Sequence, residues 1–246
     1  MISNKQMAIG GTVILLLAVG GDLAWLHYER NQPGPMPAAA AKVDPDDLVF
    51  LKQQRPSSLA DVKQLAGATV WMAAGGQLDY YPCAGRRADY SKPVGTLLGA
   101  EPLAIKDAFE QVAPKSANVR IPRGDKQVLL AFRLPSSADP ARLYAVPVGY
   151  KQGSDYSFAN DQIFFYDDPH LLFNHWGPKI WQAVDAHQVI LGMSERQVGL
   201  SLGQLTRSQG KDYGNRSVVY ENLGKPMVVT FVGDQVTDFH PGSTAF

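Results

Sequence analysis

The spacing of hydrophobic and polar residues divides this chain into an apolar N-terminal run, a middle part with β-type patterning and a mixed C-terminal part. Residues 7–21 carry no charge and are mostly apolar. From residue 68 to residue 166, short β-type runs alternate with Gly, Pro, Asp and Ser clusters, which is the pattern of strands joined by turns. Beyond residue 166 the apolar spacing becomes helical, and short β-type runs then return. The chain is therefore predicted to have an α+β fold.

The middle part is predicted to form a small all-β, barrel-like domain. Its expected strands are residues 69–73, 78–81, 94–98, 102–108, 127–134, 143–148 and 162–166. The clearest strand alternates Val128, Leu130, Phe132 and Leu134 on one face with Leu129, Ala131 and Arg133 on the other. Because both faces are largely apolar, we expect this strand to be covered on both sides.

Two helices are expected before the first of these strands. The first covers residues 46–53. The second covers residues 58–66, with Ser57 or Ser58 as its N-cap and Gly67 as its stop.

Two further helices follow the middle part. Asp168 and Pro169 form an N-cap and first-turn pair, which predicts a short helix through Trp176 that ends at Gly177. The next helix is expected to begin at Pro178 and to reach residue 190. Its buried stripe is predicted from the three-and-four spacing of Ile180, Ala183, Val184, His187 and Leu191.

A third helix and a sheet are predicted to complete the C-terminal part. Ser194 and Gln197 have the spacing of a capping box, and Met193 and Val198 have that of a hydrophobic staple. After Gly203, turn-type residues separate three β-type runs, which predicts a three-stranded antiparallel meander of residues 217–221, 227–232 and 235–239.

The N-terminal run is the strongest indication of where the protein is located. Lys5 precedes the run, and apolar residues continue past Asp22 to position 28, which gives roughly the 20 residues that span a bilayer. A cleaved signal peptide fits residues 7–21 alone, whereas Trp25 and Tyr28 fit an interfacial anchor. We favour the uncleaved single-pass anchor, with the N-terminus in the cytoplasm and the main body in the periplasm.

The predicted organisation has four parts. These are the anchor at residues 1–28, a Pro- and Ala-rich linker at 29–44, the β-rich domain with its leading helices at 45–160, and the α+β domain at 161–246. Residues 161–203 form the predicted joint between the last two.

Composition narrows the class of partner. Lys and Arg together number 23, and Asp and Glu together also number 23, so the formal net charge is zero. There is therefore no broad positive field to attract nucleic acid. Cys83 is the single cysteine, which excludes an internal disulfide and a cysteine-only metal site. The sequence contains no Walker loop, dinucleotide fingerprint or HExxH motif, and no cofactor is predicted.

Two parts of the chain resemble known families. The series 78–82, 94–98, 103–106 and 143–146 resembles a bacterial Src-homology-3-like barrel, which implies a ligand groove. That family usually places a Trp where Tyr144 stands. The phrases 190–198, Leu202-Gly203, Val219-Tyr220 and 229–231 resemble the BamE/SmpA/OmlA type of small envelope domain. This resemblance implies an α+β layer that binds protein partners and brings no catalytic residues, although Gln204-Leu205 and the missing lipid-attachment cysteine depart from the family pattern.

Three sets of residues are candidates for chemistry. His170, His175 and Asp167 are nitrogen and oxygen donors that a zinc or iron site needs, although their spacing is also explained by a cap and by packing. Residues 199–203 match the serine-hydrolase elbow literally, but they continue a helix, so Ser201 is expected to be a solvated helix residue. The aromatic residues proposed for a peptide or glycan groove are Tyr80, Tyr81, Tyr144 and Trp176.

The sequence therefore favours a membrane-anchored envelope protein with a noncatalytic scaffold or partner-binding role and an envelope protein as its partner. A cell-wall module that binds peptidoglycan through the barrel groove is the first alternative. A metal-dependent hydrolase is the second, and it requires His170, His175 and an Asp to converge.

Overall fold

The structure is a computed structural model that describes residues 25–28, 30, 43–115 and 120–243. Contacts within the chain define two compact units, Met1–Asp44 and Pro45–Phe246, and both sheets belong to the second. No helix among the described residues is long and apolar enough to cross a membrane. The apolar run 7–21, on which the predicted anchor depends, and most of the predicted linker lie outside the described residues.

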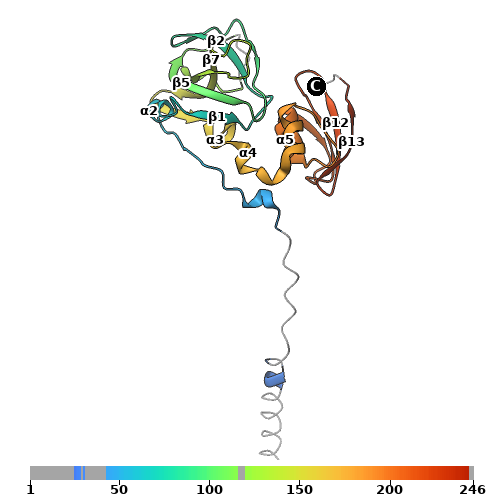
Figure 1. Cartoon of the computed structure of the whole chain (residues 1–246). Helices are drawn as coiled ribbons and strands as arrows, with labels where there is room; N and C mark the ends of the chain where they lie inside the picture. The colour runs from blue at the N-terminus through green and yellow to red at the C-terminus, as the bar shows by residue number, and fades with distance from the viewer. Residues whose placement is uncertain (1–24, 29, 31–42, 116–119, 244–246) are drawn as a thin grey trace, which may run out of the picture. The chain divides into compact units, whose positions relative to one another are not determined.

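The fold is mixed α+β, with two antiparallel sheets and few helices (Figure 1). The first sheet has the order β3-β2-β7-β6-β5-β1-β9, with β4 also paired to β2 and β8 to β7. Its strands are β1 (Thr69–Met72), β2 (Asp79–Ala84), β3 (Arg87–Ala88), β4 (Gly95–Thr96), β5 (Pro102–Gln111), β6 (Lys126–Arg133), β7 (Leu143–Gln152), β8 (Asp155–Phe158) and β9 (Phe164–Phe165).

Strand β6 is covered on both faces, as its sequence predicts. Its residues from Gln127 to Phe132 are all buried. Val128, Leu130 and Phe132 belong to one hydrophobic cluster, whereas Leu129 and Ala131 belong to a second cluster on the opposite face. Alternation of side chains along a strand explains this division.

The predicted strand 162–166 is partly wrong. Residues Asn160–Ile163 form the short helix α3, and only the two residues of β9 pair with β1. Asn160 and Ile163 are both buried, so packing against the first sheet selects the helical turn in place of an extended chain.

The central helices begin where the sequence predicts but are shorter. Asp168 caps α4 (Pro169–Leu172) by accepting a hydrogen bond from the His170 backbone N–H. The chain breaks at Phe173 (φ −112°, ψ 39°) and continues as the 3-10 helix η2 (Asn174–Trp176), so the predicted single helix is two elements. Gly177, at φ 77°, ends η2.

Helix α5 (Gly177–Asp185) ends five residues before the predicted residue 190. Its stripe is correct for Ala183 and Val184, which are buried, but His187 has a φ of 51° and Leu191 is exposed. The periodicity continues by coincidence beyond the helix, where the backbone already turns toward Ser194.

The second sheet has four strands rather than the predicted three. It has the order β10-β11-β12-β13, with β10 (Thr206–Gln209), β11 (Ser217–Tyr220), β12 (Met227–Val232) and β13 (Gln235–Pro241). All four residues of β10 are exposed and polar, so this edge strand lacks the apolar alternation that predicts a strand.

Helix α6 (Glu195–Leu202) packs with α5 and belongs to the second hydrophobic core, together with residues of β11 and β12. The predicted capping box is present: Ser194 Oγ accepts from the Gln197 N–H, and Gln197 Oε1 accepts from the Ser194 N–H at 2.9 Å. Met193 and Val198 are both fully buried in the same cluster.

We expect Ser194→Ala to lower the free energy of unfolding by about 1 kcal/mol, because one N-terminal backbone donor of α6 then loses its acceptor. Urea unfolding measures this loss. Ser243→Ala, at an exposed position after β13, serves as the control and is expected to change stability by less than about 0.5 kcal/mol. An equal effect of the two substitutions would show that the box contributes nothing.

The segment before the first sheet is mostly irregular. The predicted helix 46–53 is only the 3-10 turn η1 (Pro45–Leu48), whereas the second predicted helix is present as α2 (Leu59–Lys63) with Ser58 as its N-cap. Residues 45–55, called the strap below, run from η1 beside α4 toward α2 (Figure 1). Contacts to distant residues fix the strap, so no local pattern predicts its path.

Candidate functional site

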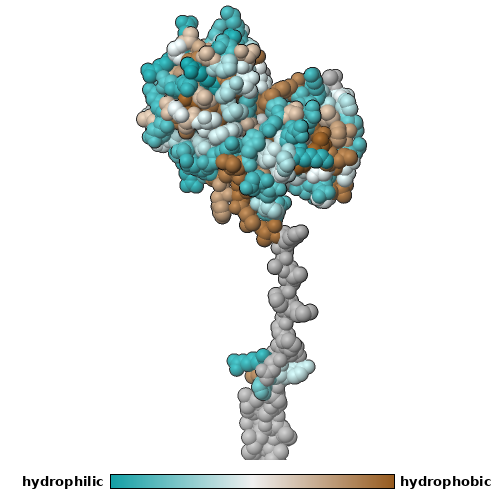
Figure 2. Space-filling model, viewed as in Figure 1, coloured by the Kyte–Doolittle hydropathy of each residue, from teal (hydrophilic) through white to brown (hydrophobic). Residues whose placement is uncertain are grey.

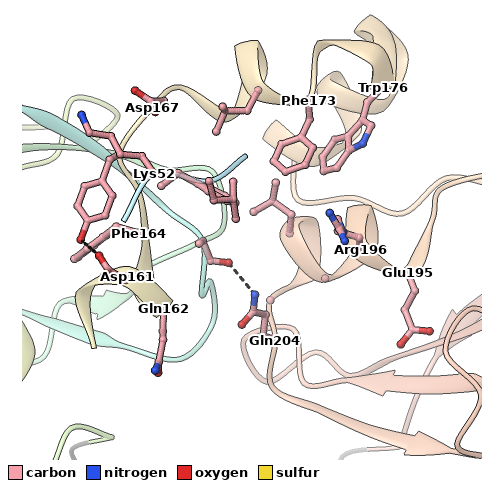
Figure 3. Close-up of a pocket in the computed structure, with 18 of the residues that line it drawn as sticks. Lys52, Asp161, Gln162, Phe164, Asp167, Phe173, Trp176, Glu195, Arg196 and Gln204 are labelled. Atoms are coloured by element: carbon pink, nitrogen blue, oxygen red, sulfur yellow. Dashed lines mark hydrogen bonds between the residues drawn. The ribbon is translucent and has the colours of Figure 1, made fainter. Parts of the chain in front are cut away.

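A pocket of about 490 Å³ lies where the strap, the end of the first sheet and the helices of the C-terminal part meet (Figure 3). Its apolar lining includes Leu51, Phe164, Phe165, Leu172, Phe173, Trp176 and Leu200. Its polar lining includes Lys52, Asp161, Asp167, Glu195, Arg196 and Gln204. A concave, mostly apolar space with a few polar groups is the usual form of a binding site.

One wall of the pocket is a stack of aromatic rings. Phe173 stacks on Trp176 with ring centroids 4.6 Å apart, and Trp176 stacks on Trp181 at 5.0 Å. Trp181 Nε1 donates a hydrogen bond to the Phe173 carbonyl at 3.0 Å. The break between α4 and η2 turns Phe173 and Trp176 toward the same side, so the irregular backbone builds this wall.

Asp46 fastens one end of the strap to the aromatic wall. Its carboxylate accepts from Trp176 Nε1 at 2.7 Å and lies 2.5 Å from His175 Nε2. Arg196 lies 3.6 Å from the other carboxylate oxygen and also contacts the Asp46 carbonyl. The Asp46 side chain is only 11% exposed, so this cluster excludes most solvent and holds η1 against η2 and α6.

Asp161 fastens the other end of the strap. Its two carboxylate oxygens accept from the backbone N–H groups of Gln54 and Arg55, each at 2.9 Å, and the Tyr166 hydroxyl donates to it at 2.8 Å (Figure 3). Partial burial raises the pKa of Asp161, but these hydrogen bonds together lower the pKa by more than burial raises it. The net shift is therefore downward. Burial and the neighbouring carboxylate both raise the pKa of Tyr166.

Glu195 is the buried charge of the site. It accepts from the Gly214 N–H at 2.8 Å and from both Nε and Nη2 of Arg216. The nearby phenol of Tyr213 also lines the pocket, and partial desolvation together with the carboxylates of Asp234 and Glu195 raises the pKa of Tyr213 to about 12. The ion pair fixes the start of α6 against the loop that joins β10 and β11.

Close backbone contacts beside the pocket join the loops of the first sheet to the end of α6. Gln204 donates from its backbone N–H to the Gly75 carbonyl at 2.9 Å and from Nε2 to the Ala73 carbonyl at 3.0 Å (Figure 3). A Cβ added to Gly99 would lie 1.9 Å from the Leu200 carbonyl oxygen, and one added to Gly75 would lie 2.2 Å from the Gly99 nitrogen. We call Gly75, Gly99 and Gly203 the glycine seam.

The structure does not bring the predicted metal ligands together. His170 contacts Asp168 and Asp185, His175 contacts Asp46, and Asp167 lines the pocket. No group of three or more His, Cys, Asp or Glu side chains is placed to hold a metal ion anywhere in the described part of the chain. The convergence that the hydrolase alternative requires is therefore missing from the described residues.

The four aromatic residues predicted to line one groove lie in three places. Tyr80 and Tyr144 pack edge to face at 5.2 Å in the core of the first sheet. Tyr81 is buried on the opposite face of β2, 4.9 Å from the ring of Tyr90. Trp176 alone lines the pocket. The expected groove is therefore wrong as a single surface, because period-two alternation sends Tyr80 and Tyr81 to opposite faces.

The elbow-like residues 199–203 lie in and directly after α6 and not between a strand and a helix. The prediction that Ser201 is solvated is wrong. Ser201 is buried, and its hydroxyl donates to the Gln188 carbonyl at 2.8 Å. His187 also contacts this segment, since its Nδ1 lies 3.1 Å from the Ser201 carbonyl oxygen. These contacts assign Ser201 a packing role.

His170 bridges two carboxylates beside the aromatic wall. Its Nδ1 lies 2.8 Å from Asp168, its Nε2 lies 3.0 Å from Asp185, and its ring packs at a tilt against Trp181, with centroids 4.1 Å apart. Partial burial lowers the pKa of His170, but the hydrogen bonds to Asp168 and Asp185 together raise the pKa by more than burial lowers it. The net shift is therefore upward.

This upward shift predicts a pH dependence. Because the folded-state pKa of His170 lies above the unfolded value near 6.5, its contribution is present in full below that value and is lost as pH rises through the folded pKa. Urea unfolding at about pH 5.5 and about pH 8 should show a smaller difference between the two conditions in His170→Gln than in the parent chain. Gln209→Ala, which replaces an exposed side chain of β10 that does not titrate, is the control and should leave the difference unchanged.

Of the residues that hold the pocket together, Trp176 was predicted as a groove residue, but its carboxylate partner was not. Asp46 and Trp176 are 130 positions apart, and Asp161 and Gln54 are 107 apart, so no spacing in the sequence relates them. Glu195 gives a weak signal, because a charged residue in the first turn of a capped helix is normally explained by the cap alone.

The fold and site define a mixed α+β protein with a partly apolar pocket at the junction of its two sheets. Comparison of the chain with protein-family models, with curated proteins and with solved structures found no match.

Proposed function

We propose that this chain is a membrane-anchored extracytoplasmic protein with a noncatalytic scaffold or partner-binding role, and that the pocket is where the partner binds. The observation that carries the proposal is the pocket of about 490 Å³, with its aromatic wall and its rim of charged side chains. Buried aromatic anchors surrounded by a polar rim are typical of protein-recognition surfaces.

Sequence features support the envelope location. The apolar run 7–21 after Lys5 fits an uncleaved anchor with the body outside the cytoplasm. A reporter enzyme fused after residue 35 is expected to be active only on the extracytoplasmic side.

Features of the fold support the resemblances without deciding them. β2 pairs with both β4 and β7, and β4 lies a few residues before β5, which favours a small curled sheet of the Src-homology-3-like kind. The order of helices followed by an antiparallel sheet favours the BamE-like layer that binds protein partners.

Photo-crosslinking in intact cells tests the proposal. A photoreactive amino acid at Leu172, which lines the pocket, is expected to trap a specific envelope protein. The same amino acid at Leu223, an exposed turn residue that does not line the pocket, should trap none. Recovery of the chain only as a soluble cytoplasmic monomer would contradict the proposal. Sedimentation with isolated peptidoglycan detects the wall-binding alternative.

Filling the pocket provides a matched test. Gly199 lines the pocket, and a Cβ added there meets no heavy atom within 4 Å. We expect Gly199→Leu to reduce the Leu172 crosslink at least about tenfold, since the new side chain occupies the space a partner's anchor needs and loss of a buried anchor costs about 2 kcal/mol. Gly199→Ala, which adds only a methyl group, should retain most of the crosslink. Equal crosslinking in both variants would place the partner elsewhere.

A further inference from the structure

The strap exposes large apolar side chains that the fold leaves uncovered. Phe50 is 91% exposed, Leu48 is 63% exposed and Leu51 is 51% exposed. Leu171, on neighbouring α4, is 74% exposed. Figure 2 shows hydrophobic surface gathered around the strap. Monomeric soluble proteins rarely leave such residues together at the surface unless a partner or membrane covers them.

The strap displays these side chains from a fixed backbone. Asp46 accepts from Trp176 at one end, and the backbone N–H groups of Gln54 and Arg55 donate to Asp161 at the other. Both ends of the strap are therefore attached to the folded body. Since neither Leu48 nor Phe50 turns inward between these attachments, the strap presents an apolar edge to whatever lies outside.

Chain length indicates what lies outside. Phe50 follows Tyr28, at the end of the predicted anchor, by 22 positions, and 22 residues span at most about 80 Å even when fully extended. The predicted anchor ends near Trp25 and Tyr28, which are exposed residues of the type found at membrane interfaces. If residues 7–28 cross the membrane, this tether keeps the strap within reach of the surface of that bilayer.

The charges of the strap distinguish two modes of membrane contact. Asp44 and Asp47 flank the apolar residues on one side and Lys52 follows them on the other, so the segment carries no basic cluster. Contact through apolar side chains fits this pattern, whereas attraction to anionic headgroups requires several Lys or Arg residues.

We propose that Leu48 and Phe50, the exposed apolar edge of the strap, insert into the headgroup region of the bilayer that holds the anchor and so fix the orientation of the body and its pocket. The inference rests on the proposed membrane anchor.

Fluorescence quenching in proteoliposomes tests this contact. The full chain is prepared with Cys83→Ser, which removes the single cysteine, and with Phe50→Cys labelled by a nitrobenzoxadiazole dye. It is reconstituted into dioleoylphosphatidylcholine vesicles. The dye is expected to be quenched by doxyl-labelled lipid and to be at least about threefold less sensitive to aqueous iodide than the same dye at Leu223→Cys. Leu223 is the matched control, an exposed apolar residue in the β11–β12 turn.

Flotation of the vesicles separates the two levels of the proposal. If the protein floats but the dye at position 50 is quenched by iodide and not by lipid, the strap contact is overturned and the anchor stands. If the protein does not float, both are overturned. Shielding from both quenchers that depends on protein concentration would indicate a second copy as the occupant. A requirement for phosphatidylglycerol would indicate attraction to headgroup charge, and either result also overturns the inference.

Discussion

Gly99→Ala will lower the free energy of unfolding by about 3 kcal/mol, at the upper end of the usual cost of overpacking. The reason is geometric, since the added Cβ would lie 1.9 Å from the Leu200 carbonyl oxygen and 2.9 Å from its carbonyl carbon. Both obstacles are backbone atoms, which cannot rotate away as a side chain can. The loop before β5 and the end of α6 must therefore move apart.

Urea unfolding measures the loss, and hydrogen exchange locates it. The Gln204 N–H, which donates to the Gly75 carbonyl across the glycine seam, should exchange faster in Gly99→Ala. Gly199→Ala is the control, because its new methyl group meets nothing within 4 Å and it lies inside α6. That control should be neutral or up to about 1 kcal/mol more stable. If Gly99→Ala were as stable as the parent chain, the close approach of the two backbones at the glycine seam would be contradicted.

Glu195→Ala has an expected effect of similar size. The substitution removes the acceptor of the Gly214 N–H and the partner of Arg216, whose side chain is only 20% exposed. Removing one partner of a buried ion pair costs about 3 kcal/mol, because the remaining charge loses its compensation. The partial exposure of Arg216 places the expected loss at the lower end of the usual range.

Urea unfolding of Glu195→Ala checks this value against Asp238→Asn, which removes an exposed carboxylate of β13 and should change stability by less than about 0.5 kcal/mol. Glu195→Gln should fall between the two, because its amide oxygen still accepts from Gly214. A loss below about 1 kcal/mol in Glu195→Ala would mean that the pair behaves as a surface ion pair.

Both predictions concern contacts that hold α6 in place at the pocket, on one side against the first sheet and on the other against the loop between β10 and β11. Gly203 of the glycine seam and Glu195 both line the pocket, so each substitution should also alter the space that the partner is proposed to occupy. The crosslink at Leu172 is therefore expected to weaken in Gly99→Ala even at temperatures where the chain remains folded.

Local signals in the sequence were read correctly where the structure depends on neighbouring residues. The Ser194–Gln197 capping box, the Asp168 cap and the two-sided burial of β6 are all present. A cap depends on residues two or three positions apart, and strand burial depends on alternation within one element. The interactions that form these features are therefore already contained in short segments.

Errors occurred where distant contacts override local preference. The helix predicted over 46–53 is a short 3-10 turn, since Asp46 and Asp161 hold the rest of the strap in an extended path. Strand β10 was missed because its residues are polar and exposed, and only pairing with β11 makes it a strand. The four aromatic residues predicted to form one groove lie in three places. The prediction failed because the spacing of residues along the chain does not show which strand faces meet in the fold.

The sequence by itself determined the α+β class, most of the strands and the starts of the central helices, because these follow from hydrophobic periodicity and from capping within a few residues. Only the tertiary structure decided the pocket, the strap and the glycine seam. Those features depend on which carboxylate meets which backbone N–H across more than a hundred positions, and on how closely two backbones approach at Gly99. Neither quantity is encoded in the spacing of residues along the chain.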